Sequence, residues 1–212
     1  MRRKLVLQQI SEEETIKKEG LTLDYDEIAR KGSMTREEVL ISKWYGIYNS
    51  RKPGDHMARI VNPGGKLSSV QIRAIAEMAE KYCLFEVVSF TTRQSVQLHK
   101  LQLEDLSSFL RDIKAAGLST MHGCGDVNRN VAVCPWASEC QHRLFDVRPY
   151  AEESARVFAA SRDLDNLPRK FKITYSGCSA GCAQPYINAG LPGLQSSPGL
   201  FRSRVRSLLR ER

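Results

Sequence analysis

The 212-residue sequence lacks any apolar run near the roughly 18–20 residues that a membrane-spanning helix needs. The start, MRRKLVLQQISEEET, is basic, but its apolar run is too short for a secretory signal peptide. Internal repeats, long low-complexity stretches and the aromatic-rich basic segments of RNA-binding modules are also missing. We therefore expect a cytoplasmic globular protein with neither a membrane nor a nucleic acid as its partner.

Positive charge is present but unevenly placed. The last twelve residues, FRSRVRSLLRER, hold five arginines against one glutamate and so account for half of the net charge of +8. Such a run is more often a solvated chain end than a contact for an acidic partner or a nucleic acid, and the remainder of the chain has an ordinary charge. We expect residues 191–212 to form a basic, poorly ordered tail.

The first part of the chain has a helical pattern. In SMTREEVLISKWYG, Ser33 is a suitable N-cap, and Leu40, Trp44 and Tyr48 follow at helical spacing. We expect Trp44 to pack in the core and residues 1–52 to form an N-terminal helical extension.

Residues 53–121 then alternate strands and helices. HMARIVN predicts a strand with Met57 and Arg59 opposite Ala58 and Ile60, and SSVQIRAIAEMAEKY predicts an amphipathic helix with a serine N-cap. Its expected apolar face comprises Val70, Ile72, Ile75, Ala76 and Ala79. LFEVVSFTT and SVQLHKL predict two strands, and LEDLSSFLRDIKAAG predicts a helix that ends at Gly117. This β-α-β-β-α order predicts an α+β fold with a ferredoxin-like split βαβ half-domain, whose sheet has one open face.

The six cysteines do not read as a disulfide framework, because the cytoplasm keeps thiols reduced. Cys83 lies in an apolar run and is expected to be a small buried residue, whereas Cys124, in a glycine-rich turn, has no assigned role. The other four form two pairs, Cys134-x5-Cys140 and Cys178-x3-Cys182. Structural zinc sites prefer pairs two to four residues apart, so the wider first pair favours a four-iron cluster. Zinc and uncoordinated or redox-paired thiols remain as alternatives.

Five cationic side chains lie near these pairs in the predicted topology. Lys170 and Lys172 are expected to share one strand face immediately before Cys178, because side chains alternate along a strand. The other three are Arg59, Arg93 and, in the GDVNRN loop, Arg129. If the open sheet face meets the cysteine region, these cations would suit a polyanionic cofactor and an anionic substrate. Taken one at a time, each is better explained as a solvated surface charge, although this explanation is less attractive for Lys170 and Lys172, which closely precede the cysteines.

Several segments in order resemble the sirohaem-dependent nitrite and sulfite reductase family. The resemblance covers roughly residues 40–188 and rests on the cysteine spacing and on PGGKLSSVQIRAIAEMAEKY, FTTRQSVQLHKL, GDVNRNV, NLPRKFKI and SGCSAGCAQPY. It implies an α/β sirohaem and iron–sulfur domain over residues 122–190, following the ferredoxin-like half-domain.

The resemblance also assigns residues to cofactors. It implies a [4Fe-4S] cluster bound by Cys134, Cys140, Cys178 and Cys182. Cys182 would also be the axial thiolate that bridges the cluster to the sirohaem iron. Arg59 and Arg93 match arginines that contact the sirohaem carboxylates or the bound anion, and Arg129, Lys170 and Lys172 match basic residues that line the substrate pocket.

The implied activity is the six-electron reduction of nitrite to ammonia or of sulfite to sulfide. The sequence has no flavin or nicotinamide motif, so a ferredoxin or a separate reductase subunit would supply the electrons. Family members with a complete site contain two such halves, and this chain resembles one, so a homodimer or pairing with a second half is expected.

The chain also departs from the family. It has Ala189 where the family commonly has Asp, and residues 191–212 resemble no segment of the family, so that the 122–190 domain reads as incomplete. A truncated or inactive half, or an iron–sulfur electron-transfer or regulatory subunit without sirohaem, is therefore an alternative to the active reductase.

Overall fold

The computed structural model describes residues 16, 22–50, 52, 54–161, 164–165, 167, 169–178, 180, 182–183 and 188–192. The predicted disorder of the basic tail falls almost wholly on residues 193–212, outside this part of the chain. The helices are α2 (Tyr25–Lys31), α3 (Arg36–Ser42), α4 (Ser69–Tyr82), α5 (Leu106–Ala115) and α6 (Arg148–Ala160), with short 3-10 turns η1 (Pro63–Gly65) and η2 (Leu103–Asp105). Among the described residues, no helix combines the length and apolarity needed to cross a membrane.

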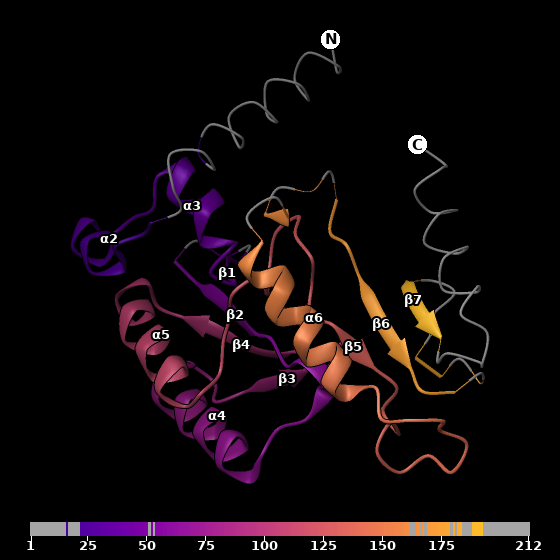
Figure 1. The fold of residues 1–212 in the computed structure, drawn as a ribbon. Helices are drawn as coiled ribbons and strands as arrows, with labels where there is room; N and C mark the ends of the chain where they lie inside the picture. The colour runs from indigo at the N-terminus through magenta and orange to yellow at the C-terminus, as the bar shows by residue number, and fades with distance from the viewer. Residues whose placement is uncertain are drawn as a thin grey trace.

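The first sheet is antiparallel and has the strand order β1-β2-β4-β3 (Figure 1). Its strands are β1 (Ile47–Asn49), β2 (His56–Ile60), β3 (Val88–Phe90) and β4 (Val96–Leu101). Along β2, Ala58 and Ile60 are fully buried, whereas Met57 and Arg59 are half-buried on the other face, as the alternation predicts. Helices α4 and α5 cover the buried face, so the predicted β-α-β-β-α order is confirmed (Figure 1).

The caps of the two covering helices follow from the sequence, but the buried face of α4 differs in part. Ser68 caps α4 in a capping box with Gln71, and Gly117, with φ +67°, follows α5 as expected. The buried residues of α4 are Ile75, Met78, Ala79 and Tyr82. Val70 and Ile72 are 74% and 49% exposed and Ala76 is also exposed, so the assignment of these three residues to the buried face was wrong.

The N-terminal helix is shorter than the periodicity predicts. Thr35, not Ser33, caps α3, in a capping box with Glu38. The helix ends at Ser42 rather than continuing to Tyr48, which belongs to the unexpected strand β1.

Gly46 explains this ending, because the chain there makes a close crossing. Its φ is +74°, and a Cβ at this position would lie 2.1 Å from the carbonyl oxygen of Thr120. Tertiary contact therefore turns the chain where helical spacing alone would continue it. Trp44 is only 6% exposed, and its predicted core position is confirmed.

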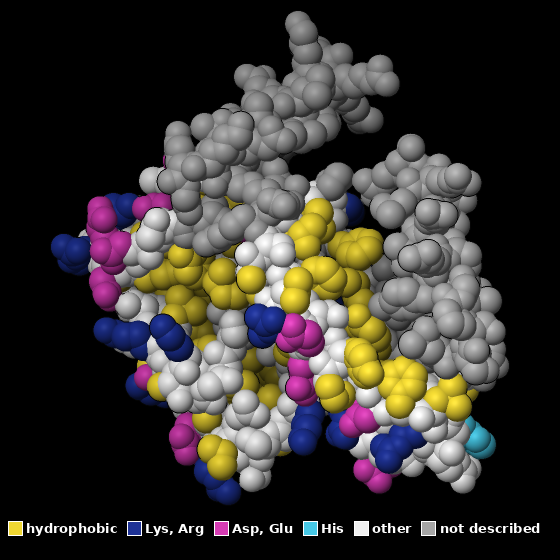
Figure 2. All heavy atoms as spheres, in the orientation of Figure 1, with side chains coloured by type: hydrophobic (Ala, Val, Ile, Leu, Met, Phe, Trp, Pro, Cys, Tyr) yellow, Lys and Arg dark blue, Asp and Glu magenta, His cyan; other side chains and the backbone are white. Residues whose placement is uncertain are grey.

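The second sheet is parallel, with the order β5-β6-β7, and comprises β5 (Ala132–Val133), β6 (Ile173–Ser176) and β7 (Ala189–Pro192). Helix α6 lies against η1, β5 and β6 (Figure 1). Figure 2 shows hydrophobic side chains gathered along this helix, where Tyr150 and Val157 stay exposed. Strand β7 was not expected, because AGLP has no strand periodicity; its pairing with β6 supplies the backbone hydrogen bonds that propensity does not predict.

Candidate functional site

The four paired cysteines lie at one end of the second sheet. Cys134 follows β5 directly and Cys178 comes two residues after β6, and these parallel strands end at the same edge. The pKa of the Cys134 thiol is raised, first by burial and then by the negative charge of the thiolates of Cys182, Cys178 and Cys140. The other three sulfurs are therefore within electrostatic reach of Cys134.

Backbone hydrogen bonds hold the two cysteine loops together. Cys134 N donates to Tyr175 O (3.1 Å), and Leu144 N donates to Gly177 O (2.8 Å). A Cβ on Gly177 would lie 2.8 Å from the carbonyl oxygen of Phe145, so glycine is required for this approach. The sequence folds locally so that the Cys-x5-Cys loop closes over the turn that carries Cys178.

The exposure of the four thiols is graded. Cys134 and Cys178 are buried, Cys140 is half-buried and Cys182 is exposed. Within the described residues, no three Cys, His, Asp or Glu side chains are placed to bind a single metal ion. The sulfurs are thus near one another without lying within reach of one shared ion. Cys83 is buried in the core as predicted.

Arg59 lies on the open face of the first sheet. Its Nη1 donates to Gly123 O (2.9 Å) and contacts Cys124 Sγ at 3.7 Å. Gln97, its register partner on β4, accepts from Arg59 Nε (2.9 Å) when the amide oxygen faces the guanidinium. A Cβ on Gly123 would lie 2.4 Å from Arg59 O, so the glycine-rich turn fits directly against β2.

Arg93 and Arg129 approach from two further segments. Arg93, in the β3–β4 turn, donates to Ile173 O (3.3 Å) and to Asn188 Oδ1 (2.7 Å), and so connects the first sheet to the second. Arg129 donates to Gly125 O (3.1 Å).

Electrostatic coupling shows that the three arginines converge. The pKa of the Arg129 guanidinium is lowered, mainly by burial and then by Arg59, with a smaller contribution from Arg93. Burial also lowers the pKa of Arg93. All three arginines are half-buried, and their side chains donate to neutral groups without forming an ion pair among the described residues.

The two lysines lie differently from the expectation. Strand β6 begins at Ile173, so Lys170 and Lys172 precede it and the prediction that they share a strand face was wrong. Phe171, between them, makes a parallel bridge with Asn128, and Lys170 N donates to Asp126 Oδ1 (3.0 Å). Both side chains are exposed, which keeps them at the surface beside the GDVNRN loop.

A basic cavity of about 270 Å³ brings Lys170 together with Arg129. Its lining residues are Leu40, Lys43, Trp44, Tyr48, Gly125, Asp126, Arg129, Asp165, Arg169 and Lys170. Arg59, Arg93 and Lys172 are not among them. Its four cationic side chains outnumber its two carboxylates, so this cavity suits a small anion.

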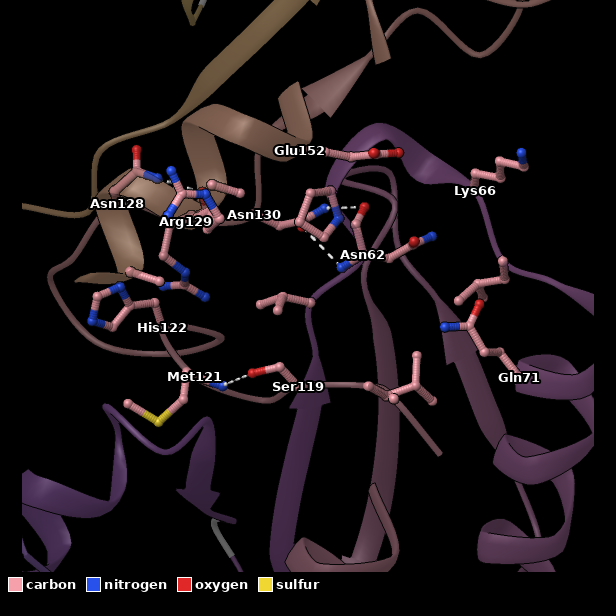
Figure 3. Close-up of a pocket in the computed structure, with 18 residues that line it drawn as sticks. Asn62, Lys66, Gln71, Ser119, Met121, His122, Asn128, Arg129, Asn130 and Glu152 are labelled. Carbon is pink, nitrogen blue, oxygen red and sulfur yellow. Dashed lines mark hydrogen bonds between the residues drawn. The ribbon is translucent and has the colours of Figure 1, made fainter. Parts of the chain in front are cut away.

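A larger cavity, of about 440 Å³, lies between η1, α6 and the turn after α5 (Figure 3). Apolar side chains form most of its surface, and we name it the polar cavity for the polar side chains that also line it. Lys66 and Gln71 lie on one side of it, with His122 and Arg129 on the other (Figure 3). Asn130 exchanges hydrogen bonds with the backbone of Asn62 at 2.9 and 3.1 Å. Arg129 alone among the described residues lines both cavities.

Three features of the site were missed at the sequence level. Gln97 orients Arg59, Lys43 lines the basic cavity, and His122 forms a buried pair with Asp165. Pairing of the two predicted strands that contain Arg59 and Gln97 could have indicated that these side chains are neighbours. The other contacts join segments far apart in the chain, and no sequence pattern reports them.

Comparison with known proteins identifies both parts of the chain. Residues 49–116 match the model of the nitrite/sulfite reductase ferredoxin-like half domain, and residues 124–188 match that of the nitrite and sulphite reductase 4Fe-4S domain. An assimilatory ferredoxin-dependent nitrite reductase of Haloferax mediterranei is 35% identical over 69% of this chain and 27% of its own length. A ferredoxin-dependent sulfite reductase of Mycobacterium tuberculosis is 28% identical over 77% of this chain and 34% of its own length.

A solved structure supports the fold. The Mycobacterium tuberculosis NirA protein matches 88% of this chain with a TM-score of 0.72 at 23% identity, over 38% of its own length. The chain thus spans about a quarter to a third of the length of its curated relatives. With a ferredoxin-like half domain and a 4Fe-4S domain in succession, this chain belongs to the nitrite and sulfite reductase family.

Proposed function

We propose that this chain is one half of a reductase that converts nitrite to ammonia or sulfite to sulfide, using sirohaem and a [4Fe-4S] cluster. Its relatives are named as ferredoxin-dependent reductases of these two anions, which supports a small oxyanion as substrate and a ferredoxin as electron donor. The chain's own residues support the same function independently.

One observation carries the proposal. Three half-buried arginines converge, the hydrogen-bond acceptors of their side chains are neutral groups, and Arg93 donates to Ile173 O on β6, the strand that precedes Cys178. Gathering like charges away from water is unfavourable unless a counter-charge compensates them. Among the described residues, Asp126 is the one carboxylate that offsets the charge of Arg129 in part, so three arginines leave an excess of positive charge that an anionic ligand from outside the chain would compensate. Sirohaem carries eight carboxylates, and the substrates are anions.

The residues present fit the two cofactors. The cluster would be held by Cys134, Cys140, Cys178 and Cys182, whose count matches the four thiolates that a four-iron cluster needs. Arg59 and Arg93 would face the sirohaem carboxylates. When bound, the cofactors supply the electrons, and the protein binds, orients and protonates the anion.

Residues of the basic cavity would bind the anion and give it protons. Arg129 would hold the oxyanion by charge-assisted hydrogen bonds and stabilise charge on its departing oxygens. Lys170, exposed at the cavity, is better suited to give protons, because an arginine guanidinium does not release one readily. Lys172, exposed beyond the cavity, would act at the approach to it.

Expression without oxygen and with a supply of sirohaem tests this function. The visible spectrum, the iron and sulfide content, and turnover of nitrite and of sulfite with reduced viologen are measured on the purified full chain. We expect sirohaem absorption bands and about four cluster irons per chain. Cys182→Ser should abolish the coupling of haem and cluster, whereas Cys83→Ser, in the core of the first sheet, should leave both groups in place.

The outcomes separate the alternatives. A brown protein with cluster iron but no sirohaem would instead make the chain an iron–sulfur subunit. A colourless, iron-free protein after reconstitution would contradict both functions. Full turnover in the Cys182→Ser variant would contradict the assigned ligand set.

Pairing with a second half of the same kind completes the proposal. The β3 edge of the first sheet carries an exposed apolar surface formed by Leu84, Phe85, Val87 and Phe90, each more than half exposed. An unpaired edge strand beside such a surface is a site for pairing with another sheet. Since the matched segment covers only 27% and 34% of two of the relatives, we assign this surface to a second half-domain. Phe90→Lys should shift the protein to monomers in sedimentation, and an unchanged dimer would contradict this placement.

A further inference from the structure

We propose that the buried His122–Asp165 pair passes protons from the polar cavity to the basic cavity. The inference rests on the proposed function, in which protons are consumed in the basic cavity. His122 Nε2 lies 2.7 Å from Asp165 Oδ1, and the side chains are 6% and 1% exposed. His122 lines the polar cavity and Asp165 lines the basic cavity. The pair therefore forms a direct contact between the two spaces.

The chemistry of the neighbouring residue supports this route. Arg129 lines both cavities, but its guanidinium remains protonated and cannot relay a proton. Histidine exchanges protons near neutral pH through two ring nitrogens, and a carboxylate can accept a proton from one of them. The His122–Asp165 pair can therefore relay a proton between the cavities, which Arg129 cannot do.

Trp44 fixes the geometry of the pair from both sides. His122 N donates to Trp44 O (2.8 Å), and Trp44 Nε1 donates to the backbone carbonyl of Asp165. Leu167 N also donates to Asp126 O (2.8 Å), which holds the Asp165 segment beside the GDVNRN loop. Both partners are therefore positioned by backbone contacts rather than by their own ion pair.

Stability alone does not explain such a pair. His122 has a φ of +59°, a left-handed conformation that is unfavourable for residues other than glycine. A buried ion pair is rarely more stabilising than well-packed apolar side chains of similar volume, because both groups lose their hydration. Strain and desolvation at one contact between two cavities are typical of a functional site.

The polar cavity can supply the protons. Its volume of about 440 Å³ would hold several waters, each of which occupies about 30 Å³ in the liquid. Lys66, Glu152 and Arg156 line it with exposed side chains, so solvent reaches it (Figure 3). Asn128 Oδ1 is buried, without a hydrogen-bond partner among the described residues, and lies in the cavity lining, where a water can satisfy it.

One cycle moves one proton. A water in the polar cavity protonates His122 Nδ1, and the Nε2 proton passes to Asp165 Oδ1. The carboxyl then protonates an oxygen of the anion in the basic cavity. The hydroxide left in the polar cavity is neutralised by solvent, and reorientation of the ring with proton exchange restores the Nε2–H form.

The test replaces His122 by glycine and supplies imidazole to the cofactor-loaded full chain. Glycine accepts the positive φ without strain and leaves a space that opens to the polar cavity. We expect turnover to fall about a hundredfold, the size of a lost proton transfer, with an unchanged KM for the anion. Imidazole in millimolar amounts should restore much of the loss. His142→Gly, at an exposed histidine, should neither lose activity nor respond to imidazole.

Thermal unfolding measures imidazole binding to the same variants independently of turnover. Imidazole should raise the unfolding temperature of His122→Gly but not that of the wild type or of His142→Gly, because only the first has an accessible vacated site. If His122→Gly does not fold, Asp165→Asn keeps the shape and removes the proton acceptor, and it should lose turnover to the same degree without rescue by imidazole.

The outcomes distinguish this inference from the proposed function. A wild type that reduces neither anion refutes the proposed function and the relay with it. If the wild type is active, full turnover in His122→Gly or Asp165→Asn refutes the relay alone. The relay is also refuted if imidazole binds to His122→Gly but does not restore its lost turnover.

Discussion

Replacing Arg129 by methionine should stabilise the cofactor-free protein. Burial and the neighbouring Arg59 both lower the pKa of this guanidinium, so the folded chain holds a charge that it disfavours. Replacing buried ionic groups by well-packed apolar side chains of similar volume stabilises by about 1–4 kcal/mol in favourable cases, and we take the lower part of this range for one partly buried charge. The lost hydrogen bond to Gly125 O, at 3.1 Å, offsets about 1 kcal/mol of this. Attraction to Asp126 offsets a further part.

The net change expected is therefore about 1–2 kcal/mol. For a chain of this size each 1 kcal/mol moves the unfolding temperature by about 2–4 °C, so the Arg129→Met midpoint should rise by about 2–8 °C. Thermal unfolding followed by circular dichroism, in chloride buffer and without cofactors, measures this shift. Arg73→Met, at an exposed position on α4, is the matched control and should leave the midpoint nearly unchanged.

The same thermal unfolding assay tests whether an anion binds beside Arg129. Sulfite at matched ionic strength should raise the midpoint of the wild type above its value in chloride, because ligands stabilise the state that binds them. Arg129→Met should lose most of this response, while Arg73→Met keeps it. Two results would refute the claim that the arginines are stabilised by an external anion. These are a lower unfolding midpoint of Arg129→Met in chloride, or a sulfite-induced rise of that midpoint as large as in the wild type.

Two further predictions concern the cysteine loops and the pH dependence of stability. Gly177→Ala should lower the iron content after reconstitution severalfold without removing a thiol, because its Cβ would meet Phe145 O at 2.8 Å and separate the loops; normal cluster loading would contradict this. Burial lowers the pKa of His56, so below about pH 6.5 the unfolded chain binds more protons than the folded chain, and stability should fall as the pH drops through that value. His56→Gln should flatten this fall in unfolding midpoints measured between about pH 7 and 5, and an unchanged slope would exclude His56 as its source.

Local sequence chemistry predicts those parts of the fold that depend on neighbours in the chain. Ser68 with Gln71 forms the expected capping box, and the alternation along HMARI places Arg59 on the open face of the sheet. These features need only residues within a few positions of one another, so periodicity and capping rules suffice.

Features that depend on distant contacts are beyond such rules. Helix α3 ends early because Gly46 meets Thr120, and β7 exists because β6 offers it a backbone edge. Strand periodicity placed Lys170 and Lys172 on a strand, but pairing with β5 and β7 extends β6 no further back than Ile173. In each case the deciding partner is far away in the sequence.

At the candidate site, the pairing of the cysteines can be predicted from local sequence, whereas the convergence of the arginines depends on distant contacts. Spacing favours a site shared by Cys134 and Cys140 with Cys178 and Cys182, and this ligand set stays a prediction, because no three of these side chains, as far as the chain is described, lie where one metal ion could bind them. The convergence of the arginines could be inferred only by assuming that the open sheet face meets the cysteine region. The structure satisfies this condition through Arg93, which leaves the first sheet to donate to Ile173 in the second. A cationic centre is thus assembled across two sheets, and under the proposed function a bound anion would stabilise its like charges beyond what Asp126 provides. The binding of an anion and the joining of the two sheets are therefore expected to be coupled.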